Sequence, residues 1–519
     1  MLKSLNKNGH VLLISRNITY IFPSGYGYLA GYLKEKGENV KILLRPDDPS
    51  QYYNFVKKIL LLKPLLVGFG TIYPDLYPTK KIIKLLNEFG RDFPIVIGGQ
   101  MVSPTPEFSV EVTGADIGVI GEGEIILYNL VKTLREGSDV EKVKGLVINK
   151  GTEKILTGQG EFIQDLSKLP KIPYELFPST EWLNVGRLYL NVPQPHNQYN
   201  DRTVTIHGGR GCPFNCNFCY HHSIPRYRSI DSMIKEAGEL IKKFNANLLY
   251  FDDDLAICSP HRARELAEKI GKLHKRVEYS VSGRFDILEQ ISDNTLMAMK
   301  KSGLRCMNIG VESGSQKILD VIHKKITVEQ ILKGIERLGK IGILPNANIM
   351  VGQLSETNED VQKSMDLMIE ALRINKNMNW SFSITTPFPG SELYDVCFKK
   401  GIFKTHYDFF KKFDENKIFN EVIANLTEMK DEEILNWLQK LRITFKLERR
   451  KLIGKHVYKI ENLRARADRL NKRINKKIFE RLANDIVSNI IKKIYTFFYN
   501  LMQVSFDKIR LKLLGVKKY

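Results

Sequence analysis

The chain has 519 residues, of which 43% are hydrophobic and 26% are charged. This length indicates three or four domains, and the composition excludes a wholly disordered chain, a fibrous protein and a polytopic membrane protein. The net charge of +21 is uneven, because residues 441–519 hold 22 basic and 6 acidic side chains, a net of +16, and leave +5 for the first 440 residues. The body of the protein is therefore close to charge-balanced.

Residues 1–150 alternate short apolar segments with segments of helical periodicity. Strands are expected at Val11–Ser15, Val40–Leu44, Leu65–Phe69, Ile95–Ile97, Ile117–Ile120 and Gly145–Ile148. Helices are expected at Tyr26–Lys36, Tyr52–Leu62, Thr79–Phe89 and Glu124–Glu136. This alternation predicts a doubly wound, Rossmann-like α/β domain whose parallel sheet is covered on both faces. Ligands of such sheets bind at the carboxyl ends of the strands, and glycines follow three of the expected strands there.

Residues 151–200 lose this rhythm and hold five prolines, which indicates an extended connector. A second alternating block occupies residues 201–420. Its expected strands are Thr203–His207, Leu248–Asp252, Glu278–Ser282, Cys306–Val311, Ala347–Val351 and Ser381–Thr385. Its expected helices are Ser232–Phe244, Arg262–Leu273, Asn294–Ser302, Val328–Ile341 and Glu359–Ile374. Six units are fewer than the eight in the ~250 residues of a closed barrel, so we expect a partial (β/α)6 TIM-type barrel.

The last region, residues 421–519, is expected to be helical and basic. No proline follows Pro389, and only three glycines follow Gly390. From Ile474 to Met502 an apolar residue recurs every four positions, while Lys and Arg fill the other side. This pattern has three interpretations: a helical cap packed on the barrel, an amphipathic helix on an anionic membrane surface, and an RNA-binding appendage.

Three of the six cysteines, Cys212, Cys216 and Cys219, form a C-x3-C-x2-C loop after the first strand of the second block. Three thiolates on a 4Fe–4S cluster leave one iron free to hold substrate. Zinc is the alternative, with His221 or His222 as the fourth ligand, although no second ligand pair follows. The remaining cysteines are read as buried thiols, so the usage fits a reducing compartment. With no signal-peptide core and no spanning segment, we expect a cytoplasmic protein.

The loop, with Phe218 just before its third cysteine, resembles the signature of the radical S-adenosylmethionine (radical SAM) enzymes. The resemblance covers about residues 200–400 and implies that the open iron chelates S-adenosylmethionine (SAM). An external one-electron donor would then drive its cleavage to methionine and a 5′-deoxyadenosyl radical. Six strand–helix units are also what this family uses.

The same resemblance implies SAM contacts at the ends of the barrel strands. The residues that match are Phe218 and Tyr220 beside the adenine, Asp253 after the second strand, Ser282 and Arg284 after the third, and Glu312 and Ser313 after the fourth. Each has a structural alternative: Asp253 as a helix cap or a solvated carboxylate, and Arg284 as a partner of Asp286 or Glu312.

Residues 10–150 resemble the cobalamin-binding domain that precedes the barrel in one radical SAM subgroup. The matching stretches are Pro23–Leu33, Pro64–Thr71, Ile95–Gln100 and Ala115–Glu124. The resemblance implies corrinoid contacts at Gly70, Thr71, Gly98, Gly99, Gly121, Glu122 and Gly123. The loop after the first strand reads Arg16-Asn17-Ile18-Thr19-Tyr20 and lacks the histidine that ligates cobalt from below in other cobalamin proteins. We therefore expect cobalamin without a histidine lower ligand, or a domain that has lost its cofactor.

Together these features predict a radical SAM enzyme that catalyses a cobalamin-dependent methylation or a related C–H or C–C transformation. The expected substrate is a small molecule or a lipid, the latter on the strength of the basic tail, which would make the enzyme peripheral to an anionic membrane. No cysteine precedes Cys212, which disfavours the methylthiotransferases that act on tRNA and hence nucleic acid as a partner. A radical SAM enzyme without cobalamin chemistry, an RNA-modifying enzyme and a non-catalytic iron–sulfur or metal-sensing protein stay open as alternatives.

Overall fold

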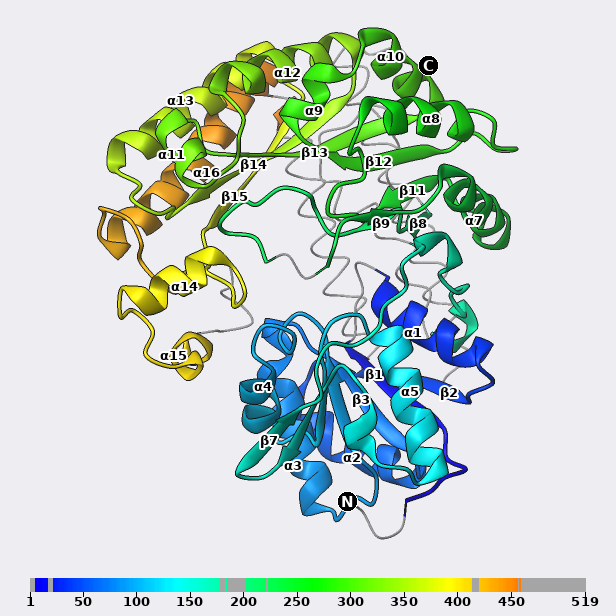
Figure 1. Ribbon diagram of the computed structural model, residues 1–519. Helices are drawn as coiled ribbons and strands as arrows, with labels where there is room; N and C mark the ends of the chain where they lie inside the picture. The colour runs from blue at the N-terminus through cyan, green and yellow to red at the C-terminus, as the bar shows by residue number, and fades with distance from the viewer. Residues whose placement is uncertain are drawn as a thin grey trace.

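The computed structural model describes residues 5–16, 22–177, 183, 202–220, 223–412, 420–455 and 457–458. These residues form two α/β domains that face each other, followed by C-terminal helices (Figure 1). The two expected parallel-sheet domains are thereby confirmed.

The first domain is a seven-stranded sheet in the order β2-β1-β3-β4-β5-β6-β7. The strands are β1 (Val11–Arg16), β2 (Val40–Arg45), β3 (Leu66–Gly70), β4 (Ile95–Gly98), β5 (Ile117–Val119), β6 (Leu146–Lys150) and β7 (Glu153–Leu156). The first five run parallel, and their order places a topological switch point between β1 and β3, where such sheets bind ligands.

The far edge of this sheet differs from the expected all-parallel arrangement. Strand β6 pairs antiparallel with both β5 and β7. Only residues 151 and 152 separate β6 from β7, and Gly151 has a φ of +84°, which a two-residue hairpin turn requires. The sheet therefore continues to Leu156, into the segment where we expected only connector.

Helices cover both faces of the first sheet because its central strands are apolar on both sides. On β1, Val11 and Leu13 belong to one core cluster, while Leu12 and Ile14 belong to the cluster on the opposite face. The helices are α1 (Ser24–Glu35), α2 (Tyr52–Leu61), α3 (Leu76–Glu88), α4 (Pro106–Thr113) and α5 (Gly123–Glu136). Helix α4 was not expected from the sequence.

The second domain is a six-stranded parallel sheet in the order β15-β14-β13-β12-β11-β8. Its strands are β8 (Thr203–Ile206), β11 (Leu248–Phe251), β12 (Glu278–Gly283), β13 (Leu304–Glu312), β14 (Leu344–Val351) and β15 (Asn379–Ile384). Within the described residues β8 and β15 are the two edges and do not pair, so the sheet is the expected partial barrel.

Helices line the outer side of this sheet, away from the first domain (Figure 1). They are α7 (Ile230–Phe244), α8 (Pro260–Ile270), α9 (Phe285–Gln290), α10 (Asp293–Ser302), α11 (Gln316–Val321), α12 (Val328–Ile341) and α13 (Asn358–Ile374). The two six-residue helices α9 and α11 were not expected, because each is too short to show a helical period. A two-stranded ribbon, β9 (Gly209–Arg210) with β10 (Arg226–Tyr227), flanks the cysteine loop.

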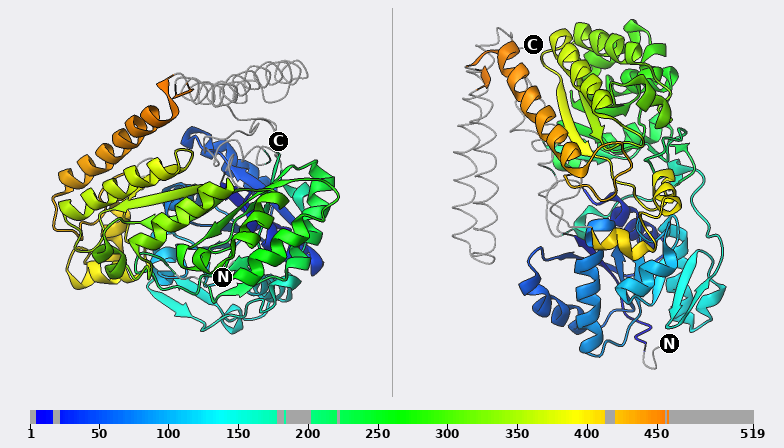
Figure 2. Two further views of the ribbon diagram at one scale, coloured as in Figure 1. Left: turned by 90° about the horizontal axis from the view of Figure 1, so that it is seen from above. Right: turned by 90° about the vertical axis from the view of Figure 1, so that its left-hand side faces the viewer.

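The C-terminal helices close the barrel edge and join the domains. Helix α16 (Asp431–Ile453) runs along α13 and β15, and Arg442 Nη2 donates to the Phe382 carbonyl oxygen at 3.1 Å (Figure 2). This contact protects a strand edge that would otherwise be open. Helices α14 (Glu392–Lys399) and α15 (His406–Lys411) share a core cluster with Tyr73 of the first domain. The described start of the basic region is thus a cap, whereas the apolar stripe from Ile474 to Met502 lies outside the described residues.

No helix among the described residues is both long enough and apolar enough to cross a membrane.

Candidate active site at the carboxyl ends of the barrel strands

The cysteine loop is held by two carboxylates that follow β11. Asp253 Oδ1 accepts the N–H groups of Gly208 at 2.6 Å and Gly209 at 3.0 Å, and Asp254 accepts that of Gly211 at 3.0 Å. Gly211 has a φ of +75°, and a Cβ there would lie 2.3 Å from the Ser223 carbonyl oxygen. Burial raises the pKa of Asp253 to about 7, although its two N–H donors oppose this shift. The structure places Asp253 as the anchor of the loop.

The three cysteines line one cavity of about 500 Å³ at the carboxyl ends of the strands, together with Phe218. Cys216 is buried, Cys212 is half-buried and Cys219 is exposed. Three thiols on one loop, opening into one cavity, are the donor set that an iron–sulfur cluster takes, so the residues present fit that group. His221 and His222, the fourth ligands in the zinc interpretation, lie outside the described residues. Among the described side chains, no three His, Cys, Asp or Glu are arranged for a single metal ion.

Arg284 supports the cysteine loop from the end of β12. Its guanidinium lies 3.5 Å from the centroid of the Phe214 ring, and Nη1 lies 3.9 Å from Cys216 Sγ. Its other nitrogens donate to Asp286 Oδ1 at 3.0 Å and to the Lys324 carbonyl oxygen at 2.5 Å. The structure therefore shows the Asp286 pairing that the sequence left open, and these partners occupy much of the guanidinium group that we expected to contact SAM.

Glu312 and Lys324 form a buried ion pair at the mouth of the barrel. Lys324 Nζ lies 2.8 Å from Glu312 Oε1, and each residue is only 6% exposed. Glu312 has a φ of +69°, a strained conformation for a residue with a side chain. Its Oε2 is buried with no hydrogen-bond partner among the described residues, which leaves an acceptor for a ligand. Lys324 was missed, because it follows a short helix twelve residues beyond Glu312 and carries no motif.

Of the other residues that we matched to SAM contacts, Ser282 lines the cavity, whereas Ser313 and Tyr220 do not. Ser282 lines the cavity, but its hydroxyl donates to the Asp253 carbonyl oxygen at 2.9 Å and accepts the Ala256 N–H at 2.8 Å. Ser313 is fully buried against Ser364 at 3.2 Å and does not line the cavity. The Tyr220 ring lies where a Cβ on Gly390 would stand, outside the cavity lining.

The floor of the cavity is polar, which sequence reasoning did not find. Asn346 Nδ2 donates to Asn308 Oδ1 at 2.9 Å, which links β14 to β13 below the cysteines. Asn348 and Ser381 line the next level up, and the Asn348 Oδ1 is buried without a hydrogen-bond partner among the described residues. The alternation of asparagine with apolar residues on β14 is the signal that could have identified these inward positions.

Some glycines at the carboxyl edge of the first sheet are required by internal packing, whereas Gly121 leaves open space. The Gly70 N–H donates to the Tyr26 hydroxyl at 2.6 Å, and a Cβ on Gly99 would lie 2.8 Å from the Thr71 carbonyl oxygen, so internal packing explains both glycines. Thr71 Oγ1 donates to the Gly98 carbonyl oxygen at 3.0 Å. Gly121, with a φ of +86°, has nothing within 4 Å of its Cβ position and leaves the edge open there. This open turn is the feature of the first domain that fits a large ligand.

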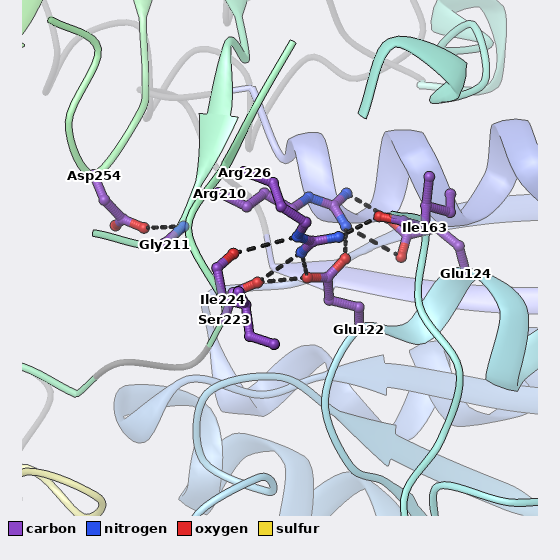
Figure 3. A network of polar contacts seen from close by, with 9 residues as sticks. All are labelled: Glu122, Glu124, Ile163, Arg210, Gly211, Ser223, Ile224, Arg226 and Asp254. Atoms are coloured by element: carbon purple, nitrogen blue, oxygen red, sulfur yellow. Dashed lines mark hydrogen bonds and ion pairs between the residues drawn. The ribbon is translucent and has the colours of Figure 1, made fainter. Parts of the chain in front are cut away.

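Glu122, one of the corrinoid contacts that we expected, is paired with side chains of the second domain. The Glu122 carboxylate faces the second domain and pairs with Arg210 and Arg226 (Figure 3). Burial alone would raise its pKa, but these two arginines and Ser223 outweigh it and hold the pKa below the usual range.

The fold and the site define a protein in which a doubly wound domain faces a partial barrel with three cysteines at its open edge. The family model of the radical SAM superfamily matches residues 206–368, and that of the B12-binding domain matches residues 13–131. The chain belongs to the radical SAM superfamily, and its first domain is of the B12-binding type.

Similar proteins match most of this chain. An uncharacterized methyltransferase of Pyrococcus horikoshii is 25% identical over 83% of this chain and 89% of its own length. The anaerobic magnesium-protoporphyrin IX monomethyl ester cyclase of Rubrivivax gelatinosus is 28% identical over 72% of this chain and 65% of its own. The radical SAM methyltransferase TsrM of Kitasatospora setae, solved with cobalamin and a [4Fe-4S] cluster, has a TM-score of 0.62 at 18% identity and covers 76% of this chain and 78% of its own. This last likeness shows the fold.

Proposed function

We propose that the protein is a radical SAM enzyme that cleaves SAM reductively and methylates a small molecule with the help of a corrinoid. The observation that carries this proposal is the single cavity onto which Cys212, Cys216 and Cys219 open beside the Glu312–Lys324 pair. In this proposal residues 1–150 are the corrinoid domain, 151–200 the connector, 201–420 the radical SAM domain and 421–519 the basic helical region. The names of the relatives from Pyrococcus horikoshii and Kitasatospora setae support methylation.

The three cysteines would hold a 4Fe–4S cluster, which when bound supplies the electron that breaks a carbon–sulfur bond of SAM. Phe218 offers an aromatic face for the adenine. The free Oε2 of Glu312 offers an acceptor for the SAM ammonium, and Lys324 holds Glu312 in place. Asp253, Ser282 and Arg284 act by keeping the cysteine loop in position, and Ser313 and Tyr220 stay as proposed contacts that the cavity lining does not include.

A corrinoid would lie against Gly98 and Gly121 at the carboxyl edge of the first sheet, and when bound it supplies a carrier for the methyl group. Thr71, Gly70, Gly99 and Gly123 would shape that edge. The loop after β1 contains no histidine in its sequence, so the corrinoid would bind without a histidine lower ligand.

The cavity floor favours a polar group of the substrate rather than a lipid chain. Asn308, Asn346, Asn348 and Ser381 line it, and an apolar chain buried there would leave the Asn348 Oδ1, which has no partner among the described residues, without a hydrogen bond, which is costly. The alternative of docking on an anionic membrane rests on residues beyond 458, outside the described part of the chain. Flotation with anionic liposomes, compared with a chain ending at residue 458, tests that docking, and equal recovery would refute it.

The proposed function is tested by anaerobic reconstitution with iron and sulfide, followed by addition of SAM and dithionite. We expect release of 5′-deoxyadenosine and its loss in Cys216→Ala. If a protein with a full cluster releases no 5′-deoxyadenosine, the proposal that it is an enzyme is refuted, and a non-catalytic iron–sulfur binding protein is the alternative. Retention of cobalamin absorbance after desalting tests the first domain.

A second candidate is a radical transformation without methylation, which the cyclase from Rubrivivax gelatinosus supports by its name. Methylation predicts S-adenosylhomocysteine as a co-product, whereas this candidate predicts none. Measuring 5′-deoxyadenosine and S-adenosylhomocysteine in one reaction separates methylation from a radical transformation without methylation.

A further inference from the structure

Two arginines lie directly opposite each other beside the cysteine loop. Arg210 of β9 and Arg226 of β10 are register partners in the antiparallel ribbon. Their side chains are only 18% and 10% exposed. Like charges at directly opposite positions of an antiparallel pair destabilise it, and partial burial weakens the screening by water. The second domain by itself therefore carries an unbalanced pair of positive charges at this point.

Two glutamates of the first domain meet these arginines. Glu122 is the N-cap of α5 and Glu124 lies in its first turn, shortly after β5, and their side chains are 12% and 5% exposed. Arg210 Nη1 lies 2.5 Å from Glu122 Oε2 and Arg210 Nη2 lies 2.5 Å from Glu124 Oε1, while Arg226 pairs with Glu122 Oε1 (Figure 3). Among the residues that the structure describes, each domain thus holds two like charges whose ion-pair partners lie on the other domain. This makes the contact specific in both position and orientation.

Neighbouring groups restrict these side chains further. Ser223 Oγ donates to Glu122 Oε1 at 2.5 Å. The guanidinium carbons of Arg210 and Arg226 lie 5.6 Å and 4.6 Å from the ring centroids of Tyr28 and Phe162. Arginine stacked on an aromatic ring and paired with carboxylates keeps one geometry, because its fork is planar and rigid.

The position of this cluster connects the two halves of the site. Arg210 precedes Cys212 by two residues, and Gly121-Glu122-Gly123 is the open turn at the carboxyl edge of the first sheet. The loop that carries the cluster ligands is therefore fastened to the turn that faces the proposed corrinoid. Transfer between two bound groups depends steeply on how they are held relative to each other.

We propose that Glu122, Glu124, Arg210 and Arg226 form an interdomain clasp that sets the distance between the cysteine loop and the corrinoid edge. They are positioning residues for methyl transfer, and the role in transfer rests on the proposed function. Glu122, for which the family resemblance implied a corrinoid contact, acts here through the loop of the other domain.

The test compares Glu124→Gln and Arg210→Lys with Glu278→Gln. The matched control is Glu278, the first residue of β12, which pairs with the buried Arg305 of β13. This pair lies at the amino ends of the strands, far from the interface between the domains. In the full chain without cofactors, we expect hydrogen exchange at residues 119–126 and 208–228 to be roughly tenfold faster in both clasp variants and unchanged in the control. Unchanged exchange at these segments in both clasp variants would overturn the clasp.

The second readout is spectroscopic. In protein loaded with cob(II)alamin and a reduced cluster, the magnetic interaction between the two centres in the electron paramagnetic resonance spectrum depends on their separation. In the clasp variants we expect this interaction to be weaker or spread over a range of values, at unchanged iron and cobalamin content. In Glu278→Gln we expect it to be the same as in the wild type. An unaltered spectrum would overturn the positioning role. Failure of the native protein to bind cobalamin would instead refute the corrinoid part of the proposed function, and hydrogen exchange would still decide the clasp.

Discussion

Lys324 Nζ lies 2.8 Å from Glu312 Oε1, although the two residues belong to different segments that meet only at the mouth of the barrel. Both residues are buried, and Glu312 sits in a left-handed backbone conformation beside the three cysteines. A buried carboxylate at this point needs its cation, because desolvation without a partner costs several kcal/mol. The pair therefore fixes one free carboxylate oxygen toward the cavity, where we place the ammonium of SAM.

Replacing Lys324 with methionine should weaken SAM binding by about tenfold or more, because Glu312 loses the contact that orients it. Equilibrium dialysis with reconstituted protein measures this dissociation constant. The neighbouring Lys325 is exposed, and Lys325→Met should leave SAM affinity unchanged. Equal affinities for the wild type and the Lys324 variant, at equal iron content, would contradict the assignment.

Replacing Asn348 with leucine should reduce substrate-dependent turnover while leaving SAM affinity within about twofold. The buried Oδ1 of Asn348 has no partner among the described residues, and a substrate donor that pairs with it would lose that hydrogen bond, worth roughly 0.5–1.5 kcal/mol. The measurement is the stimulation of S-adenosylhomocysteine formation by the water-soluble fraction of a cell extract. A tenfold rise in the SAM dissociation constant would show that Asn348 holds SAM instead.

Glu356 should make the protein less stable as the pH rises. Its carboxylate is buried and accepts the Gly352 N–H at 2.6 Å, and burial raises its pKa from 4.5 to about 8. Because the folded state holds this proton more tightly than the unfolded chain, its stabilising contribution is complete below about pH 4.5 and is lost as the pH rises to about 8.

As the pH rises from 5 to 9, the free energy of unfolding of Glu356→Gln should therefore increase by roughly 3–5 kcal/mol relative to that of the wild type. Urea unfolding at the two pH values measures this difference. Glu359→Gln, in the first turn of the α13 helix that follows Glu356, removes an exposed carboxylate and should show no such trend. Parallel pH profiles for wild type and Glu356→Gln would refute the assignment of a raised pKa.

Replacing Tyr26 with phenylalanine should destabilise the first domain by about 1–3 kcal/mol. The hydroxyl accepts the Gly70 N–H at 2.6 Å and donates to the Ile14 carbonyl oxygen at 2.6 Å, so it joins the ends of β3 and β1 at the switch point. Removal leaves a backbone donor without its partner. Chemical unfolding measures the loss, and Tyr53→Phe on the exposed face of α2 should cost nothing measurable.

The sequence by itself determined the two-domain order, strands β1 to β6, the six strands of the partial barrel and the cysteine loop, because each depends on local pattern. Val328–Ile341 is a helix with the bounds that its periodicity predicts, and the spacing of Cys212, Cys216 and Cys219 already brings three thiols onto one loop. Short elements such as α9 and α11 were not visible, since six residues do not establish a period.

Only the tertiary structure decided which side chains face each other. The pairing of Glu312 with Lys324, the asparagine floor and the clasp between Glu122 and Arg210 join residues from separate elements, and no local pattern encodes such contacts. Glu122 shows the difference most clearly. Its Gly-Glu-Gly-Glu context indicated a ligand-binding turn, but the approach of a second domain gives its carboxylate two arginines instead, because buried charges are stable only when they are paired.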